Sequence, residues 1–224
     1  MRYPRDDPGY ARLATLDIET TAADPAEGEL VSIGVGHHDR SDPLSKATYE
    51  SFHRRGDDEV ALVRDAVAWL DDAGADALVS YNGVGFDLDF IDARLDRHGV
   101  DISRPAVADA DTHLDLFRDR RRRAERDGDP WPALEDCLRA YGLTPATTVW
   151  QGAPVDNTRF GEELGPAYLR TLDTATGARL RDALVEAIDH YLRTDLEANF
   201  ALFYADIGDS PDPSYLGTRA QFDV

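Results

Sequence analysis

The chain has 224 residues, of which 42% are hydrophobic and 9% aromatic, a composition that excludes a disordered polyelectrolyte and predicts one folded domain with a substantial core. The single cysteine, Cys137, excludes an internal disulfide framework. No apolar run is long enough to span a membrane, and the N-terminal segment lacks the apolar centre of a signal peptide. We therefore expect a cytoplasmic protein.

The charge balance is strongly acidic. Asp and Glu total 44 against 24 Lys and Arg, a formal net charge of −20, and Lys46 is the single lysine. One interpretation is a surface adapted to a cytoplasm of molar salt, as in a halophilic archaeon, where the Debye length falls to about 3 Å and self-repulsion is screened. The other is a surface that repels nucleic acid. The acids are spread along the chain instead of forming a tail, which favours the first interpretation.

The predicted elements begin with three strands, at residues 13–20, 29–39 and 47–54, whose short connections favour an antiparallel meander. The elements that follow are a helix at 57–74, a strand at 77–82, a helix at 88–98, a strand at 106–111, a helix at 134–143 and a long helix from about 175 to 206. Three antiparallel strands followed by alternating helices and strands predict an α/β fold: a mixed five-stranded sheet with helices on both faces.

The second half of the chain also contains less regular segments. A single domain is expected over residues 1–207, followed by an extended tail at 208–224. An irregular and partly helical excursion at about 125–175 is predicted to pack over the domain, because its aromatic side chains need a surface. The arginines at 120–123 are predicted to lie on a solvated helix face, paired with neighbouring acids, with phosphate contact as the alternative.

The first strand carries two acids in an apolar setting, since Asp17 and Glu19 alternate with Leu16 and Ile18. Residues two apart in a strand point the same way, so the two carboxylates share a face. Left unpaired in a low-dielectric site, they would raise each other's pKa at a cost of several kcal/mol. Buried arginines, a divalent cation or a strand end open to water would each resolve this. Carboxylate oxygens are hard ligands suited to Mg²⁺ or Mn²⁺.

Two later segments carry polar residues of the same kind. Asn82 and Asp87 bracket two glycines and Phe86 where a strand passes into a helix, and the glycines permit a tight turn close to a ligand. In the last helix, Tyr191 and Asp195 are four residues apart and share one face. Taken singly, Asp87 is also explained as a helix cap, and the Tyr–Asp pair as a surface pair.

Taken in order, these segments resemble a known family. D-x-E in the first strand, N-x-x-x-F-D after a later strand and Y-x-x-x-D in the last helix resemble the exonuclease motifs of the DEDD superfamily of 3′–5′ exonucleases, with stand-alone prokaryotic RNase H-like domains as the most similar group. The resemblance implies an RNase H-like fold and two divalent cations, Mg²⁺ or Mn²⁺. The residues implied as their ligands are Asp17, Glu19, Asp87 and Asp195.

The chemistry implied by the resemblance is hydrolysis of phosphodiester bonds at the 3′ ends of single-stranded DNA or RNA. Two cations about 3.5–4 Å apart would clamp the scissile phosphate, one activating the attacking water and the other stabilising the leaving 3′ oxygen. Substrate contacts are implied for Asn82, Thr20 and Phe86. The sequence indicates no protein partner.

Several alternatives stay open. The last motif of the superfamily is Y-x-x-x-D or H-x-x-x-x-D, and the chain satisfies both, through Tyr191 and His190. Helix geometry favours Tyr191, which is within about 40° of Asp195, whereas His190 is about 140° away. Asp111 is a weaker site candidate, with a helix cap as its other interpretation. A non-catalytic binding module of the same fold and an endonuclease are the alternative functions.

Overall fold

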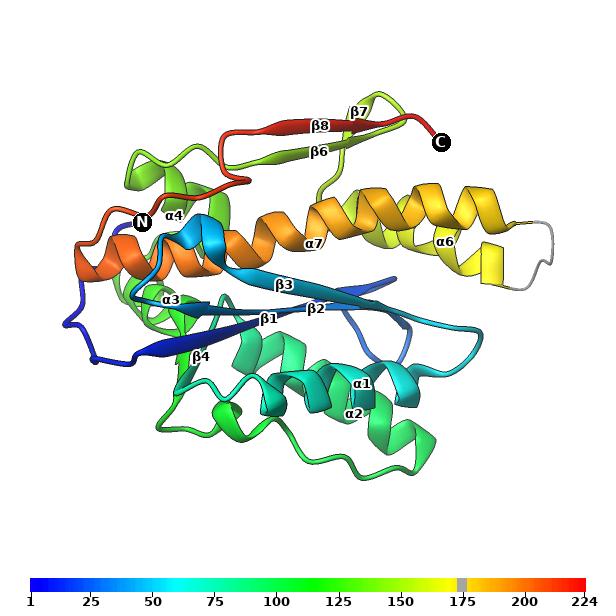
Figure 1. Cartoon of the computed structure of the whole chain (residues 1–224), viewed down its shortest axis with the longest axis horizontal. Helices are drawn as coiled ribbons and strands as arrows, with labels where there is room; N and C mark the ends of the chain where they lie inside the picture. Colours follow the sequence, from blue (N-terminus) through cyan, green and yellow to red (C-terminus); the bar gives the residue numbers. More distant parts are fainter. Residues whose placement is uncertain (173–176) are drawn as a thin grey trace.

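The centre of the fold is a mixed five-stranded sheet, seen in a computed structural model that describes residues 1–172 and 177–224 (Figure 1). β1 (Arg12–Thr20) pairs antiparallel with β2 (Leu30–Asp39) and parallel with β4 (Ala77–Ser80). β3 (Thr48–His53) lies outside β2, and β5 (His113–Asp115) lies outside β4. The strand order is therefore β3-β2-β1-β4-β5, and the predicted α/β fold is confirmed.

Two helices, α1 (Glu59–Asp72) and α2 (Leu88–His98), cover one face of this sheet (Figure 1). The even-numbered residues of β1, Ala14, Leu16 and Ile18, are buried in the core that these helices form with the sheet. Since side chains alternate along a strand, the odd-numbered residues of β1 face the other side. The two acids of the D-x-E motif are therefore directed away from α1 and α2.

The opposite face is crossed by α7 (Ala178–Ile207), which lies between the main sheet and a second, smaller sheet (Figure 1). The second sheet has the order β7-β6-β8 and consists of β6 (Thr147–Trp150), β7 (Ala153–Pro154) and β8 (Arg219–Phe222). Gly34 of β2 lets α7 come close, because a Cβ there would lie 3.0 Å from the side chains of Leu192 and Leu196. The middle of α7 is thus buried between two sheets.

The remaining elements are short or lie around the edges of the sheets. They are η1 (Leu44–Lys46), η2 (Gly83–Asp87), η3 (Ala106–Ala108), α3 (Leu116–Asp127), α4 (Leu134–Ala140), α5 (Asn157–Arg159), η4 (Phe160–Leu164) and α6 (Gly165–Leu172). Among the described residues, no helix is both long and apolar enough to cross a membrane.

The residues after α7 are held by a buried carboxylate. Glu197 of α7 is 0% exposed and accepts hydrogen bonds from the backbone N–H groups of Ser214, Tyr215 and Leu216 at 2.6, 2.6 and 2.8 Å. β8 then pairs parallel with β6. The C-terminal segment, whose strand is β8, is packed on the domain through these contacts.

One predicted strand is wrong. Residues 106–111 were expected to be extended, but Ala106–Ala108 form a 3-10 turn and the strand is His113–Asp115. The carbonyl of Asp109 accepts hydrogen bonds from the N–H groups of Thr112 and His113 at 3.1 and 2.8 Å. A turn therefore takes the backbone groups that a strand would have used. The predicted start of the last helix near residue 175 lies outside the described residues.

The prediction for the arginine run is correct for three of its four members. Arg121, Arg122 and Arg123 are exposed on α3 and pair with acids on the same helix. Arg120 is different, because its side chain is 0% exposed and forms an ion pair with the equally buried Asp206 of α7. The predicted solvated face is therefore wrong for Arg120, whose ion pair with Asp206 joins α3 to α7.

Candidate active site

The register between β1 and α7 brings three acids together. Asn199 Nδ2 of α7 donates a hydrogen bond to Thr15 Oγ1 of β1 at 3.2 Å. Two residues advance a strand by about 6.7 Å and four residues advance a helix by about 6 Å. Two residues after Thr15 on β1 is Asp17, and four residues before Asn199 on α7 is Asp195, so these two acids lie opposite each other. Glu19 follows on the same face of the strand. The spacing of the two motifs matches the geometry of the two elements.

The three acids form a tight cluster. Carboxylate oxygens of Asp17, Glu19 and Asp195 lie within 4.8 Å of one another. Burial raises the pKa of Asp17 to about 7. Burial, followed by the charges of Asp17 and Asp195, raises the pKa of Glu19 well above its ordinary value. In residues 1–172 and 177–224, none of the three acids forms an ion pair with a basic side chain. Buried arginines were one of the predicted explanations, but in the described residues they do not neutralise these acids.

A fourth acid is presented by the turn that follows β4. The turn begins at Asn82, a non-glycine residue in the left-handed region with φ 71°, and continues as the π-helical segment η2. Asp115, at the end of β5, holds the turn by accepting hydrogen bonds from Asn82 N at 3.0 Å and Val84 N at 3.1 Å. The same carboxylate caps α3 by accepting from Phe117 N at 3.0 Å. Asp87, the last residue of η2, is positioned by these contacts.

Asp87 faces the other acids without a donor of its own. It is 3% exposed, and its Oδ2 atom is buried with no hydrogen-bond partner among the described residues. Burial, and after it the charges of Asp17 and Asp115, raise the pKa of Asp87 well above its ordinary value. A buried carboxylate oxygen without a partner costs free energy unless a cation or a hydrogen-bond donor meets it.

The donor set fits a hard divalent cation. The cluster offers only carboxylate oxygens, which Mg²⁺ and Mn²⁺ prefer over nitrogen or sulfur ligands. A cation would remove the mutual repulsion that raises the pKa of Glu19 and would meet the unpartnered oxygen of Asp87. In the part of the chain that the structure describes, no other group of three acids, histidines or cysteines brings its ligand atoms so close.

The two candidates for the last motif face different ways. Tyr191 donates its hydroxyl hydrogen to Asn157 Oδ1 at 2.8 Å, and its ring stacks on Phe160 with centroids 5.6 Å apart. Burial, followed by the charges of Asp195 and other acids of the cluster, raises the pKa of Tyr191 well above its ordinary value. His190 instead points to the second sheet, where its Nδ1 lies 2.7 Å from Thr148 Oγ1 of β6. Tyr191 is therefore the member of this pair beside the acids.

The four acids line a cleft of about 590 Å³. The three residues expected to contact substrate also line it: Thr20, Asn82 and Phe86. Phe86 is half-buried and packs on Phe90 of α2, with ring centroids 5.8 Å apart. The predicted site residues therefore line one cleft, with three exceptions: Tyr191 contacts the lining residue Asn157 from behind it, and His190 and Asp111 lie elsewhere.

One wall of the cleft comes from the segment α5–η4, residues 157–164. Asn157 and Glu162 line the cleft. Gly161 packs against the end of β1 so closely that a Cβ there would lie 3.0 Å from the carbonyl oxygen of Thr21. A side chain at this position would push the wall away, so the glycine sets the width of the cleft at this point.

Asp111 does not belong to the site. It is exposed in the turn before β5, where its carbonyl oxygen accepts a hydrogen bond from Tyr10 OH at 3.1 Å. β5 runs parallel to β4, so residues before β5 lie at the end of the sheet opposite to the cleft. The helix cap is also a different residue, since Asp115 caps α3. The aspartate that ends the strand is Asp115 and not Asp111, because the strand ends four residues later than predicted.

Two residues of the site were missed by the sequence analysis. Asp115 had a usable signal, because an aspartate directly before a helical segment is a preferred cap. Asn157 had none, since it lies in an irregular segment 34 residues before its partner Tyr191.

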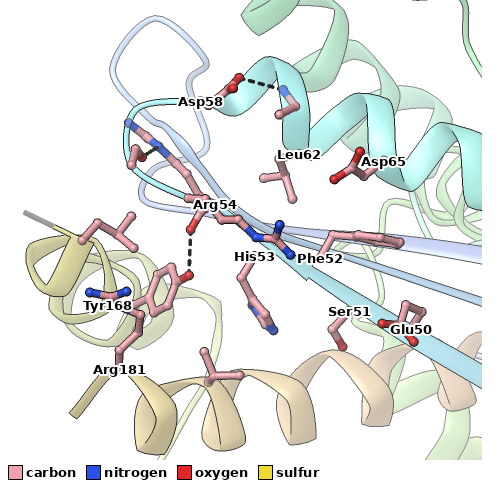
Figure 2. Close-up of a pocket in the computed structure, with 15 residues that line it drawn as sticks. Glu50, Ser51, Phe52, His53, Arg54, Asp58, Leu62, Asp65, Tyr168 and Arg181 are labelled. Carbon is pink, nitrogen blue, oxygen red and sulfur yellow. Dashed lines mark hydrogen bonds between the residues drawn. The ribbon is translucent and has the colours of Figure 1, made fainter. Parts of the chain in front are cut away.

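A second cavity, of about 510 Å³, lies at the end of β3 between α1, α6 and α7 (Figure 2). Figure 2 shows Arg54, Asp58 and Asp65 around it, with the Tyr168 hydroxyl donating to the Arg54 carbonyl at 2.7 Å. Its charges are of both signs, and its Arg54 is already paired with Glu29 and other acids. The acids that resemble a catalytic set all lie in the other cleft.

Comparisons with known proteins agree with this fold. A family model for the RNase_H superfamily matches residues 14–204. No curated protein matches the sequence. Among solved structures, a family B DNA polymerase from the hyperthermophilic archaeon Pyrobaculum calidifontis is similar over 90% of this chain, with a TM-score of 0.56 and 17% identity. The chain covers 25% of that polymerase, and at this identity the likeness shows the fold alone. Because the family model spans most of its length, the chain belongs to the RNase H superfamily.

Proposed function

We propose that the protein is a metal-dependent nuclease that degrades single-stranded nucleic acid from its 3′ end. The observation that carries the proposal is the cluster of Asp17, Glu19 and Asp195 within 4.8 Å, with the unpartnered carboxylate oxygen of Asp87 beside it. Membership of the RNase H superfamily supports a nucleic-acid substrate.

The four acids would hold two cations, Mg²⁺ or Mn²⁺. Bound there, the cations would supply Lewis-acid polarisation of the scissile phosphate and a lower pKa for a bound water. The chain itself gathers and orients the ligands. The β1–α7 register sets Asp17, Glu19 and Asp195, while the Asp115 carboxylate fixes the turn that presents Asp87. Because the four carboxylates are already gathered, little ordering of these side chains is needed when the substrate binds.

Tyr191 is assigned to orient the attacking water. Its hydroxyl hydrogen is committed to Asn157 Oδ1, which directs the oxygen lone pairs away from Asn157 and makes them available to accept a hydrogen bond from water. Phe160 stacks on the ring and fixes its plane. This role needs a phenol that stays protonated and keeps its position. The raised pKa of Tyr191 keeps the phenol protonated, and the contacts with Asn157 and Phe160 hold it in place.

The wall formed by residues 157–164 supports action at a strand end. It packs directly on the end of β1 through Gly161, next to the acids. Phe86 offers a half-buried aromatic ring to the cleft, and an aromatic face of this kind stacks on a terminal base. Thr20 and Asn82 line the same cleft and are assigned to polar contacts with the terminal nucleotide.

The acidic surface is explained by a cytoplasm of molar salt. A net charge of −20 would oppose nucleic-acid binding in dilute buffer. At molar salt the Debye length is about 3 Å, so long-range repulsion disappears together with most of the affinity from phosphate contacts. Recognition then depends on the metal site, stacking and hydrogen bonds. Activity should therefore be assayed in molar KCl.

The experiment that tests the proposal compares linear with circular single strands. Linear DNA and RNA labelled at the 5′ end, and a circular DNA of the same composition, are incubated with the protein, molar KCl and Mn²⁺. We expect a ladder that shortens from the 3′ end, loss of the ladder with EDTA, and an intact circle. Cutting of the circle would identify an endonuclease, and intact strands in every reaction would identify a non-catalytic module.

A further inference from the structure

One large aromatic side chain lies exposed beside the cleft. Trp131 is 56% exposed, and within the described residues Leu180 is the other exposed large hydrophobic side chain. The guanidinium of Arg121 lies 4.5 Å over the indole ring, and the Phe117 ring meets it edge-on with centroids 6.0 Å apart. The indole is therefore held in place by its neighbours while most of its surface is open to solvent.

The exposed indole is continuous with the cleft of the four acids. Phe117, which contacts Trp131, lines that cleft. The chain also runs directly from Trp131 into the cleft wall, because Ala133 and Leu134 line it too. Tyr81, another lining residue, donates its hydroxyl hydrogen to the carbonyl of the intervening Pro132. A strand that leaves the cleft on this side passes the indole.

The backbone around the indole is stiff. Trp131 stands between Pro130 and Pro132. Each proline fixes its own φ angle, and Pro132 restricts Trp131 to extended conformations. Binding a flat partner on this ring therefore costs little conformational entropy, which is the usual requirement of an aromatic recognition residue.

The helix that carries Arg121, α3, is rich in arginine, in a chain whose net charge is −20. Arg118, Arg121 and Arg122 are exposed within one turn of this helix, and Arg122 lies 3.9 Å from Asp119. Arg118 has no ion pair among the described residues. Arg121 pairs with Glu125 at 2.9 Å on the surface, an exposed pair of small free energy that a phosphate can replace. The occupant that fits has flat aromatic groups joined by negative charges.

We propose that Trp131, held by Phe117 and Arg121, is a stacking site for a base of the single strand upstream of the nucleotide being removed. This inference rests on the proposed nuclease function and assigns the path of its substrate outside the cleft. Stacking on an aromatic ring tolerates every base. It also persists in molar salt, where contacts between arginine and phosphate contribute little.

The kinetic test uses a series of 5′-labelled single strands of decreasing length. For long strands, Trp131→Ala is expected to raise KM about ten-fold with kcat unchanged, because Trp131 touches a nucleotide that does not react. Trp131→Phe keeps an aromatic ring and is expected to change KM less than about three-fold. For a dinucleotide, which offers no further upstream base to the indole, the two variants should match wild type. Leu180→Ala, the matched exposed control, should match wild type for every strand.

A binding test does not depend on turnover. With EDTA present, a single strand is expected to quench tryptophan fluorescence in wild type and much less in Trp131→Phe. Of the two tryptophans that remain in that variant, Trp150 is buried, and Trp69 is half-buried on α1 against His37 and does not line the cleft. Equal quenching in both proteins, or an unchanged KM for Trp131→Ala with long strands, would overturn the inference while leaving the nuclease proposal intact. Quenching at Trp131 without any cleavage would support the stacking site and overturn the nuclease proposal.

Discussion

Replacing Asp17 with asparagine is expected to make the metal-free protein more stable at alkaline pH. Burial raises the pKa of Asp17 from an ordinary 3.8 to about 7, a difference of about 3. Keeping this carboxyl ionised therefore costs free energy in the folded state that it does not cost in the unfolded chain. At about 1.4 kcal/mol for each pH unit, the upper limit is about 4 kcal/mol. Because the half-buried carboxylate faces the cleft and solvent screens it, we expect about 1–2 kcal/mol.

The pH dependence of this gain has a definite sign. A carboxyl whose pKa is raised in the folded state holds its proton more tightly there than in the unfolded chain. Its contribution to stability is therefore full below about pH 4 and is lost as the pH rises to about 7. Asparagine cannot ionise. The gain from Asp17→Asn should be close to zero at about pH 4 and complete above about pH 7.5.

Denaturant unfolding in EDTA and molar KCl measures this gain. Wild type is compared with Asp17→Asn and with Asp65→Asn, an exposed carboxylate in the wall of the second cavity. Added Mn²⁺ should stabilise wild type more than Asp17→Asn, because the cation binds the folded protein through this carboxylate. Equal stability of wild type and Asp17→Asn at about pH 8, or an equal gain from Asp65→Asn, would refute the reasoning.

Three further predictions concern side chains around the acids. Tyr191→Phe should lower kcat about ten-fold or more with little change in KM, and His190→Ala should lower it less than about two-fold; equal steady-state rates for the two variants would contradict the assignment. Asp115→Asn loses the charge that holds the turn after β4. Denaturant unfolding should therefore show a loss of about 1–2 kcal/mol in stability, and steady-state kinetics a lower kcat. A kcat equal to that of wild type would show that the turn does not depend on the Asp115 carboxylate. Glu197→Gln should cost about 2 kcal/mol and expose the C-terminal segment to limited proteolysis, and an unchanged digestion pattern would exclude its anchoring role.

The local periods predict that Asp17 and Glu19 share one face of β1 and that Tyr191 and Asp195 share one face of α7. The meeting of the two motifs was implied by the resemblance to the exonuclease family, because no period within one element encodes its register with another. The structure supplies that register through the contact of Asn199 with Thr15. The choice between Tyr191 and His190 followed from helix geometry. The structure shows where His190 lies instead: its side chain is on the face of α7 that the second sheet covers.

The parts that were missed depend on contacts between distant segments. Asn157 meets Tyr191 across 34 residues, and β8 pairs with β6 across the whole of α7. No local period encodes either contact. Arg120 was placed on the surface because its neighbours in the arginine run are there, and only the position of Asp206 on α7 shows that it is buried.

The displacement from Asp111 to Asp115 has a similar cause. Asp111 lies in the turn before a short strand and Asp115 ends that strand, so the strand boundary decides which of them can hold the turn that presents Asp87. Strand boundaries depend on pairing with a neighbour, here β4, and the sequence of the segment alone does not define them.

Cleavage of nucleic acid by the acidic cluster with a divalent cation can be measured directly. A 5′-labelled single strand is incubated in molar KCl and Mn²⁺ with wild type, with Asp17→Asn and with the control Asp65→Asn. We expect a ladder that shortens from the 3′ end with wild type and Asp65→Asn, and an intact strand with Asp17→Asn. A folded wild-type protein that leaves the strand intact, or an Asp17→Asn protein that cleaves it at the wild-type rate, would contradict the assignment of these acids as the catalytic site.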